Sequence, residues 1–309
     1  MINVAVMIEG QDGVNWPRWK RIAEVVDKTG FAGLYRSDHF TNPRGPHKDA
    51  LELWTSLTYL ASQTKNIQFG PLVSPVSFRD PVTTAWVASA VDDLSGGRLR
   101  LGLGAGWQER EHHDFGYDLL PTLKKRFQRF EEGLEVISHL LRDDEPTTFT
   151  GEYYKLDGAL LMPRPARKGG PPIVIGGKGP LRTLPLVAKF ADEWNAVGGQ
   201  TPATFPELNQ RLKDLLKEAG RDDASVHRSL MTTVIFGRTQ ADVDAQAQAE
   251  GKTPAELIAA GRVVGTGDAI VDQIKEWEAA GLQTIMLRWA DLDDMAGLEA
   301  LGKSILHRV

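Results

Sequence analysis

The chain carries polar groups suited to acid–base chemistry at the end of an apolar run, GLYRSDHF (residues 33–40). Asp38 and His39 are adjacent there, and a carboxylate beside an imidazole fixes the tautomer and raises the basicity of the histidine. The same two side chains could instead cap a helix and hydrogen-bond to each other. Both interpretations stay open from these residues alone.

A second segment, GLGAGW (residues 102–107), has glycine at three alternate positions. Backbone without side chains lets a flat or anionic ligand approach closely. A dinucleotide-binding motif does not fit, because we expect no helix directly after the glycines. In addition, TLKKRF stands where a ribose-binding acid would follow about 20 residues on. The glycines could also simply relieve crowding inside a barrel.

A third segment, IGGKGPLRTL (residues 175–184), places glycines before a helix that Pro180 could start. Free backbone N–H groups would then face an anion, with Lys178 and Arg182 alongside. A phosphate site is the functional interpretation, and a glycine-rich turn is the structural one.

Other kinds of reactive site have less support. His112 and His113 are adjacent and point apart on a helix or strand, so we expect no metal site. The chain has no Cys and no G-x-S-x-G segment, which excludes thiolate chemistry, disulfides and a nucleophile elbow. Trp107 and Trp194 stand at predicted strand ends, where an aromatic side chain could stack on a planar ring.

These segments need strands whose carboxyl ends meet at one face. Continuous apolar runs predict eight parallel strands covered on both sides. They are residues 3–8, 33–37, 67–73, 99–104, 172–176, 194–197, 229–236 and 284–287. Helical patterns lie between them, at 127–141, 208–216 and 270–277, the last closed by Gly281. The alternation predicts an α/β fold, a (β/α)8 TIM barrel, in preference to an open doubly wound sheet.

Local signals refine this barrel. Asn15 with Pro17, and Asp80 with Pro81, mark helix starts. Two insertions exceed a minimal barrel, near residues 108–125 and 145–170, and FTGEYYKL in the second predicts a small hairpin. Because no linker divides the chain, we expect one domain over residues 1–309.

The composition limits the partners. Hydrophobic residues make up 41% and charged residues 25%, as in an ordinary soluble protein. The formal net charge of -5 gives no basic surface for nucleic acid or anionic membrane. No window approaches the apolar length of a membrane span, and MINVAVMIEG is too short for a secretory signal. We therefore expect a cytoplasmic protein that acts on a small molecule, with no nucleic-acid or membrane partner.

Taken together and in order, three stretches resemble the luciferase-like monooxygenase family, and more closely its branch of deazaflavin (coenzyme F420)-dependent oxidoreductases. They are SDHF, then SFRDPVTTAWVASAVDDLSGGRLRLGLGAGWQEREH, then PPIVIGGKGPLRTLPLVAKFADEWN. The resemblance is strong over residues 1 to about 200 and weaker at VVGTGDAIVDQIKEWEAAGLQTIML.

The resemblance implies a barrel with insertions, a flavin-like ring across its top, and a homodimer. It implies a non-prolyl cis peptide at Val73–Ser74, behind the ring. It also implies that His39, held by Asp38, is the proton donor or an electrostatic partner. In some sugar-phosphate-oxidising relatives a catalytic Glu occupies the position of Trp107. Its absence here argues against that substrate class and leaves Glu111 and His112 as alternative proton donors. We expect His112 and Trp194 on the substrate side. The residues implied to bind the cofactor are Val73, Ser74, Gly104, Ala105, Gly106, Trp107, Gly176, Gly177, Lys178, Gly179 and Arg182.

The implied reaction is hydride transfer between F420 and a small organic substrate. A deazaflavin has carbon in place of the central redox nitrogen of flavin, so it moves electrons as hydride and barely reacts with oxygen. An FMN-dependent monooxygenase that uses molecular oxygen is the first alternative. A cofactor-binding barrel without catalysis is the second.

Overall fold

The computed structural model describes residues 1–309, and its main sheet is a nearly closed parallel barrel. The strand order is β3-β2-β1-β12-β10-β9-β8-β5-β4, with β11 added beside β10. A bridge between Phe69 of β3 and Leu99, just before β5, links the first strand of this order to its other side. The strands are β1 (Asn3–Ile8), β2 (Gly33–Arg36), β3 (Gln68–Pro71), β4 (Ser74–Pro75), β5 (Leu101–Gly104), β8 (Ile173–Gly176), β9 (Glu193–Ala196), β10 (His227–Phe236), β11 (Val263–Gly265) and β12 (Thr284–Arg288).

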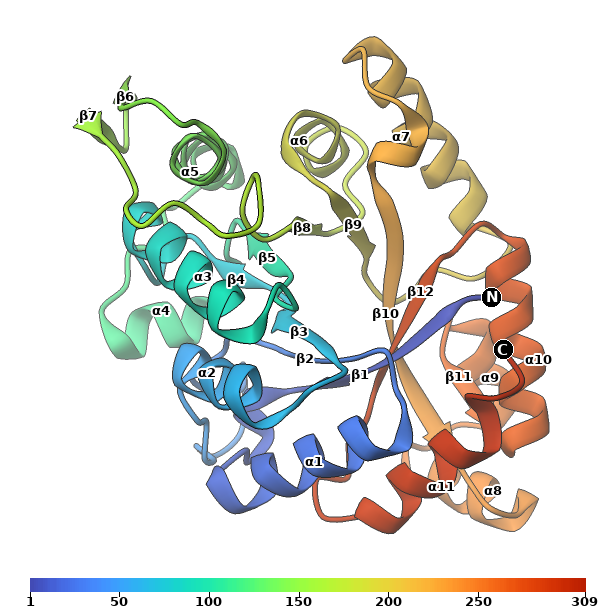
Figure 1. Cartoon of the computed structure of the whole chain (residues 1–309). Coiled ribbons are helices and arrows are strands. Elements are labelled where there is room, and N and C mark those ends of the chain that lie inside the picture. The colour runs from blue at the N-terminus through green and yellow to red at the C-terminus, as the bar shows by residue number, and fades with distance from the viewer.

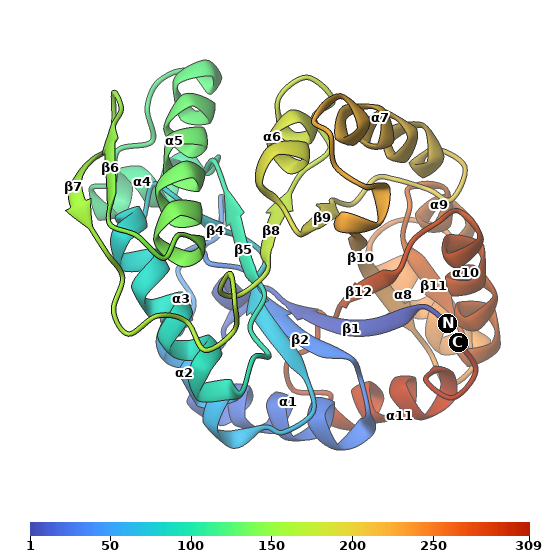
Figure 2. The same cartoon turned by 45° about the horizontal axis from the view of Figure 1, so that its top comes forward.

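All eight predicted strands are present, and the barrel prediction is confirmed over the open sheet. Helices ring the strands, and the two termini lie close together on one side (Figures 1 and 2). The helices are α1 (Trp16–Thr29), α2 (Leu53–Gln63), α3 (Pro81–Ser95), α4 (Glu109–Phe115), α5 (Leu123–Arg142), α6 (Thr183–Phe190), α7 (Phe205–Glu218), α8 (Gln240–Ala249), α9 (Pro254–Ala259), α10 (Gly267–Ala279) and α11 (Met295–Ile305).

Local capping chemistry places several helix ends where the sequence predicts them. The Asn15 side chain accepts a hydrogen bond from the Arg18 N–H, and the Asp80 carboxylate accepts one from the Val82 N–H. Beyond the end of α10, Gly281 takes a left-handed φ of 95°. The start of α6 was predicted at Pro180 and lies instead at Thr183. The reason is that residues 180–182 form a separate turn. The carbonyl of Gly179, just before this turn, accepts hydrogen bonds from the Thr183 and Leu184 N–H groups.

The two insertions have definite structures. In the second, β6 (Thr147–Thr150) and β7 (Lys155–Ala159) pair antiparallel, which confirms the hairpin. The first contains α4 and the start of α5. Helix α4 begins at Glu109, directly after the glycine segment, so the expectation that no helix follows there was wrong. The glycines nevertheless belong to a closed barrel, and not to the open sheet that a dinucleotide-binding motif needs.

The non-prolyl cis peptide lies at Leu72–Val73, one bond earlier than the family resemblance implies. The pairing explains where the chain changes direction. The Leu72 N–H still donates to the Arg36 carbonyl at 2.7 Å, whereas Ser74 already pairs with Leu103 of β5. The change of neighbouring strand is therefore centred on Val73.

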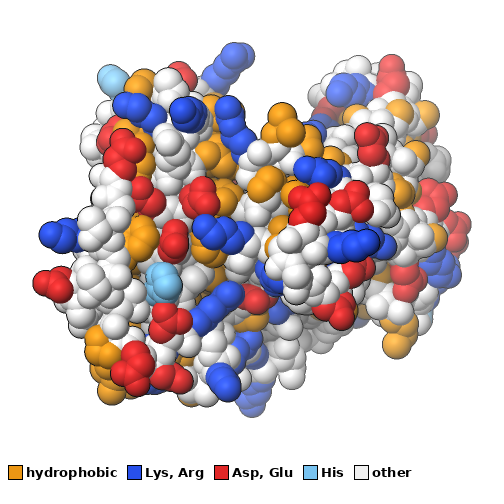
Figure 3. Space-filling model, turned by 90° about the horizontal axis from the view of Figure 1, so that it is seen from above, with side chains coloured by type: hydrophobic (Ala, Val, Ile, Leu, Met, Phe, Trp, Pro, Cys, Tyr) orange, Lys and Arg blue, Asp and Glu red, His pale blue; other side chains and the backbone are white.

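The surface seen from above has no large patch of a single charge. Acidic and basic side chains are interspersed there, with hydrophobic side chains scattered among them (Figure 3). None of the helices combines the length and the apolar character that a bilayer crossing requires.

Candidate active site

A cavity of about 480 Å³ opens at the carboxyl ends of the barrel strands. This is the face where enzymes of this architecture place their reacting groups. Nine residues that were singled out from the sequence line this cavity. They are His39, Val73, Gly104, Ala105, Gly106, Trp107, Glu111, Gly176 and Gly177.

Glycine backbone forms part of the cavity floor for a packing reason. A Cβ on Gly104 would lie 2.7 Å from Val73 Cγ2, and one on Gly176 would lie 3.1 Å from Val73 Cγ1. A Cβ on Gly102 would lie 2.0 Å from the Pro71 carbonyl oxygen. Relief of crowding therefore accounts for these positions, and it leaves a floor of backbone and Val73 that a flat ligand could approach.

His39 is held by Glu111 of α4. Its Nδ1 lies 2.8 Å from Glu111 Oε1, and the second carboxylate oxygen of Glu111 accepts the Phe40 N–H at 3.1 Å. Because a carboxylate only accepts, Nδ1 carries the proton, while Nε2 makes no hydrogen bond to the protein and the His39 side chain lines the cavity. Burial acts to lower the pKa of His39, but the hydrogen bond and charge of Glu111 outweigh it, so the pKa is raised.

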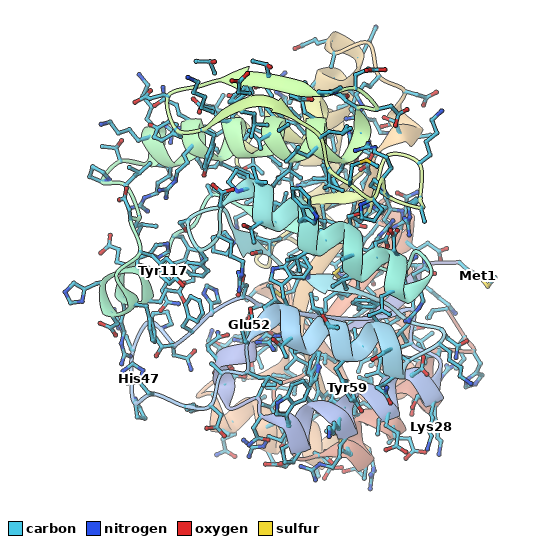
Figure 4. The ribbon with its side chains drawn as sticks, turned by 60° about the vertical axis from the view of Figure 1, so that its left-hand side comes forward. Met1, Lys28, His47, Glu52, Tyr59 and Tyr117 are labelled. Carbon is cyan, nitrogen blue, oxygen red and sulfur yellow. The ribbon has the colours of Figure 1, made fainter.

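Aromatic packing fixes α4 against the loop that follows His39. The Phe40 ring stacks on Tyr117 at 5.6 Å between centroids and lies 5.2 Å from Phe115. Arg110 of α4 also contacts the His47 ring of that loop. Figure 4 shows His47 and Tyr117 at the same edge of the molecule. The loop and α4 therefore position the His39–Glu111 pair together.

Asp38 does not hold His39. Its carboxylate accepts the Ser74 hydroxyl at 2.6 Å and forms an ion pair with Arg79, which in turn pairs with Glu52. Figure 4 labels Glu52 at the start of α2. Asp38 and Ser74 are buried and do not line the cavity. The prediction of an Asp38–His39 pair was wrong, because the Asp38 carboxylate contacts Ser74 and Arg79 whereas His39 contacts Glu111.

Two residues predicted on the substrate side lie outside the cavity wall. His112 is buried, donates to the Gln108 carbonyl through Nδ1 at 2.6 Å, and meets the Ser77 hydroxyl through Nε2 at 2.7 Å. Burial lowers the pKa of this imidazole. Trp194 is fully buried, donates to the Gly177 carbonyl at 2.7 Å, and stacks on Phe205. Both support the wall from behind.

The predicted anion site lies at the rim. Gly177 and Thr183 line the cavity, whereas Lys178, Gly179 and Arg182 do not. Lys178 and Arg182 are exposed; Lys178 Nζ makes one hydrogen bond, to the Gly198 carbonyl, and Arg182 makes none. Both charges are thus available to a ligand that extends out of the cavity, and phosphate binding there stays a prediction.

Several cavity residues were not singled out from the sequence. Glu9 follows β1, Asn195 belongs to β9, and Met231 belongs to β10. Glu9 directly follows a predicted strand, which is the signal that could have found it, whereas Asn195 and Met231 lie inside predicted strands. Leu123 and Phe127 of α5 also line the cavity, and only the folded insertion brings them there.

The lining fits a planar, largely apolar ring. Val73, Leu72 and Met7 offer apolar surface, the glycine segments offer bare backbone, and polar groups such as His39 stand at the edge. Trp107 is 61% exposed and meets the His39 ring edge-on at 5.6 Å. It stands at the cavity mouth, where an aromatic side chain can cover a bound ring.

Two relatives are similar in sequence over much of the chain. The 5,10-methylenetetrahydromethanopterin reductase of Archaeoglobus fulgidus is 26% identical over 81% of this chain and 67% of its own length. The F420-dependent glucose-6-phosphate dehydrogenase of Nakamurella multipartita is 31% identical over 65% of this chain and 58% of its own length.

Solved structures share the fold at lower identity. An F420-dependent secondary alcohol dehydrogenase in complex with an F420-acetone adduct matches with a TM-score of 0.82 and 18% identity, covering 100% of this chain and 99% of the other. The monooxygenase RslO1 of Streptomyces bottropensis matches with a TM-score of 0.82 and 16% identity, covering 100% and 98%. At such identities the likeness establishes the fold alone.

The family assignment rests on a match along most of the sequence. The model of the family described as luciferase-like monooxygenase matches residues 3–253. This range includes His39, Glu111 and the glycine segments of the cavity floor. The chain therefore belongs to the luciferase-like monooxygenase family of oxidoreductases.

Proposed function

We propose that the protein is an F420-dependent oxidoreductase that transfers a hydride between the deazaflavin and a small organic substrate. The observation that carries the proposal is the His39–Glu111 pair, which leaves Nε2 of a raised-pKa imidazole for the cavity. When bound, the deazaflavin would supply or accept the hydride. His39 would donate a proton through Nε2 to the substrate atom that becomes a hydroxyl or C–H.

The remaining residues would bind and orient the cofactor. Val73 and the backbone at Gly104 and Gly176 would contact the ring, with Trp107 at the mouth. Lys178 and Arg182 would meet the phosphate of the tail at the rim, because both cations are exposed there. Names of relatives support this cofactor, since the Nakamurella multipartita relative and the alcohol dehydrogenase are F420-dependent by name.

An FMN-dependent monooxygenase is the second candidate, supported by the likeness to RslO1. Oxygen chemistry needs a cavity that keeps water out. Trp107 and Leu123 line the cavity mouth and could cover a bound ring in either reaction. The preference for hydride transfer rests on the relatives that are F420-dependent by name.

The test is direct binding of each cofactor to the purified protein. F420 and FMN are titrated separately and fluorescence quenching is followed. We expect F420 to bind more tightly, and spectra of protein purified from its native host to show the deazaflavin chromophore. Tighter binding of FMN would reverse the choice between the two candidates.

A further inference from the structure

Four polar side chains form a chain through the barrel lumen. Arg100, directly before β5, pairs with Glu193 at 2.9 Å, and Glu193 accepts the Ser229 hydroxyl at 2.5 Å. Ser229 in turn accepts the Asn195 side-chain N–H at 2.9 Å. Glu193, Ser229 and Asn195 are each at most 1% exposed. Asn195 is the member that lines the cavity, so the chain ends at the candidate active site.

The ion pair sets the direction of every hydrogen bond in this chain. A carboxylate paired with a guanidinium can only accept, so the single hydroxyl proton of Ser229 goes to Glu193. Ser229 Oγ is then left as an acceptor for Asn195. The amide of Asn195 must therefore turn its Nδ2 to Ser229, where it also lies 3.5 Å from Met286 Sδ.

This orientation presents an acceptor to the ligand. With Nδ2 turned to Ser229, Asn195 Oδ1 faces the other way and accepts no hydrogen bond from the protein. Asn195 Oδ1 is nevertheless not one of the fully buried side-chain atoms that lack a hydrogen-bond partner, so part of its surface remains accessible. Since Asn195 lines the cavity, Oδ1 is open to it. A buried amide oxygen in that state needs an N–H or O–H donor from whatever binds.

We propose that Asn195 Oδ1 accepts the N–H of the imide edge of a flavin-type ring, and that the Arg100–Glu193 pair positions this amide. The inference rests on the proposed function, because it takes the bound molecule to be such a ring. Deazaflavin and flavin share a pyrimidinedione edge with one N–H between two carbonyls. Asn195, in β9, stands across the strand order from His39, which follows β2. Ring recognition and proton donation thus use different walls.

The alternative is that these four hydrogen-bonded side chains only stabilise the interior of the barrel and do not contact the ligand. In that case, substitutions would change stability but not the selectivity between two rings that differ only at the imide nitrogen. The two roles are therefore separated by comparing a ring that has the N–H with the same ring methylated at that nitrogen.

The experiment measures, by fluorescence quenching, the Kd of lumiflavin and of N3-methyl-lumiflavin, which lacks the imide N–H. The Kd of the F420 ring without its tail is measured in the same way. Wild type should bind lumiflavin about tenfold or more tighter than its N-methyl form. Asn195→Leu should bind both equally weakly while keeping its melting temperature within a few degrees. Thr232→Val is the control. It removes a buried β10 hydroxyl that donates to the Gly261 carbonyl and does not belong to the four hydrogen-bonded side chains, so this variant should keep the wild-type preference for lumiflavin.

Glu193→Gln tests the positioning role. A glutamine amide can donate to Ser229, so Ser229 would donate to Asn195 and turn its Nδ2 toward the cavity. The preference for the unmethylated ring should then disappear without any change at the cavity wall. Equal binding of the two rings by wild type would overturn the inference and leave the proposed function standing. Failure of wild type to bind lumiflavin and the F420 ring would overturn both.

Discussion

Glu111 Oε1 lies 2.8 Å from His39 Nδ1, although the two residues are 72 positions apart in the chain. The contact joins the loop after β2 to α4 and decides which imidazole nitrogen is free. It also replaces Asp38 as the group that orients the proposed proton donor.

Replacement of His39 should separate catalysis from binding. His39→Ala should lower turnover by about 10²- to 10⁴-fold while F420 still binds, because only the proton donor is lost. The measurement is steady-state kcat beside the Kd of F420. His113→Ala is the matched control, since His113 is 90% exposed. An unchanged rate in His39→Ala would favour a barrel that binds the cofactor without catalysis.

Glu111 should control the pH dependence. Because Glu111 raises the pKa of His39, the protonated imidazole persists to higher pH, and reduction should slow only as pH rises through that pKa. Glu111→Gln leaves burial as the main influence, which lowers the pKa, so the fall should begin at lower pH. The check is the pH profile of kcat, with exposed Glu109→Gln as control. Superimposable profiles would contradict the role of Glu111.

Asp38 should matter for stability. Asp38→Ala removes one of the two carboxylates that pair with Arg79, the other being Glu52, in a site where the Asp38 and Arg79 side chains are both less than a fifth exposed. Because Arg79 keeps Glu52, the loss of Asp38 should lower the free energy of unfolding by about 1–3 kcal/mol. Urea unfolding measures this, with Asp157→Ala on the exposed side of β7 as control. A stable Asp38→Ala protein with reduced turnover would instead return Asp38 to a direct role in the reaction.

The rim cations should act on affinity. Arg182→Ala and Lys178→Ala should raise the Kd of F420 and leave turnover at saturating cofactor unchanged, because neither residue lines the cavity. Lys168→Ala is a control in the loop before β8, at the opposite ends of the strands. The phosphate assignment fails if both variants bind F420 as tightly as the wild type.

The barrel was predictable because its signals are local. Continuous apolar runs identify strands, and side chains such as Asn15 and Asp80 identify helix starts. The cavity position was predictable too, since strand ends of a barrel share one face. The partner of His39 was not, because sequence adjacency to Asp38 says nothing about which way each side chain points. Folding of α4 against the loop brings Glu111 there instead.

The stretch between β5 and α5 supplies two things at once. Trp107 in this stretch and Leu123 at the start of α5 stand at the cavity mouth, and Glu111 between them orients His39. Replacing the whole stretch with that of another barrel, in order to change the substrate range, would therefore also remove Glu111 and its hydrogen bond to His39. A workable chimera has to graft the two ends of the insertion and retain the helix in its middle.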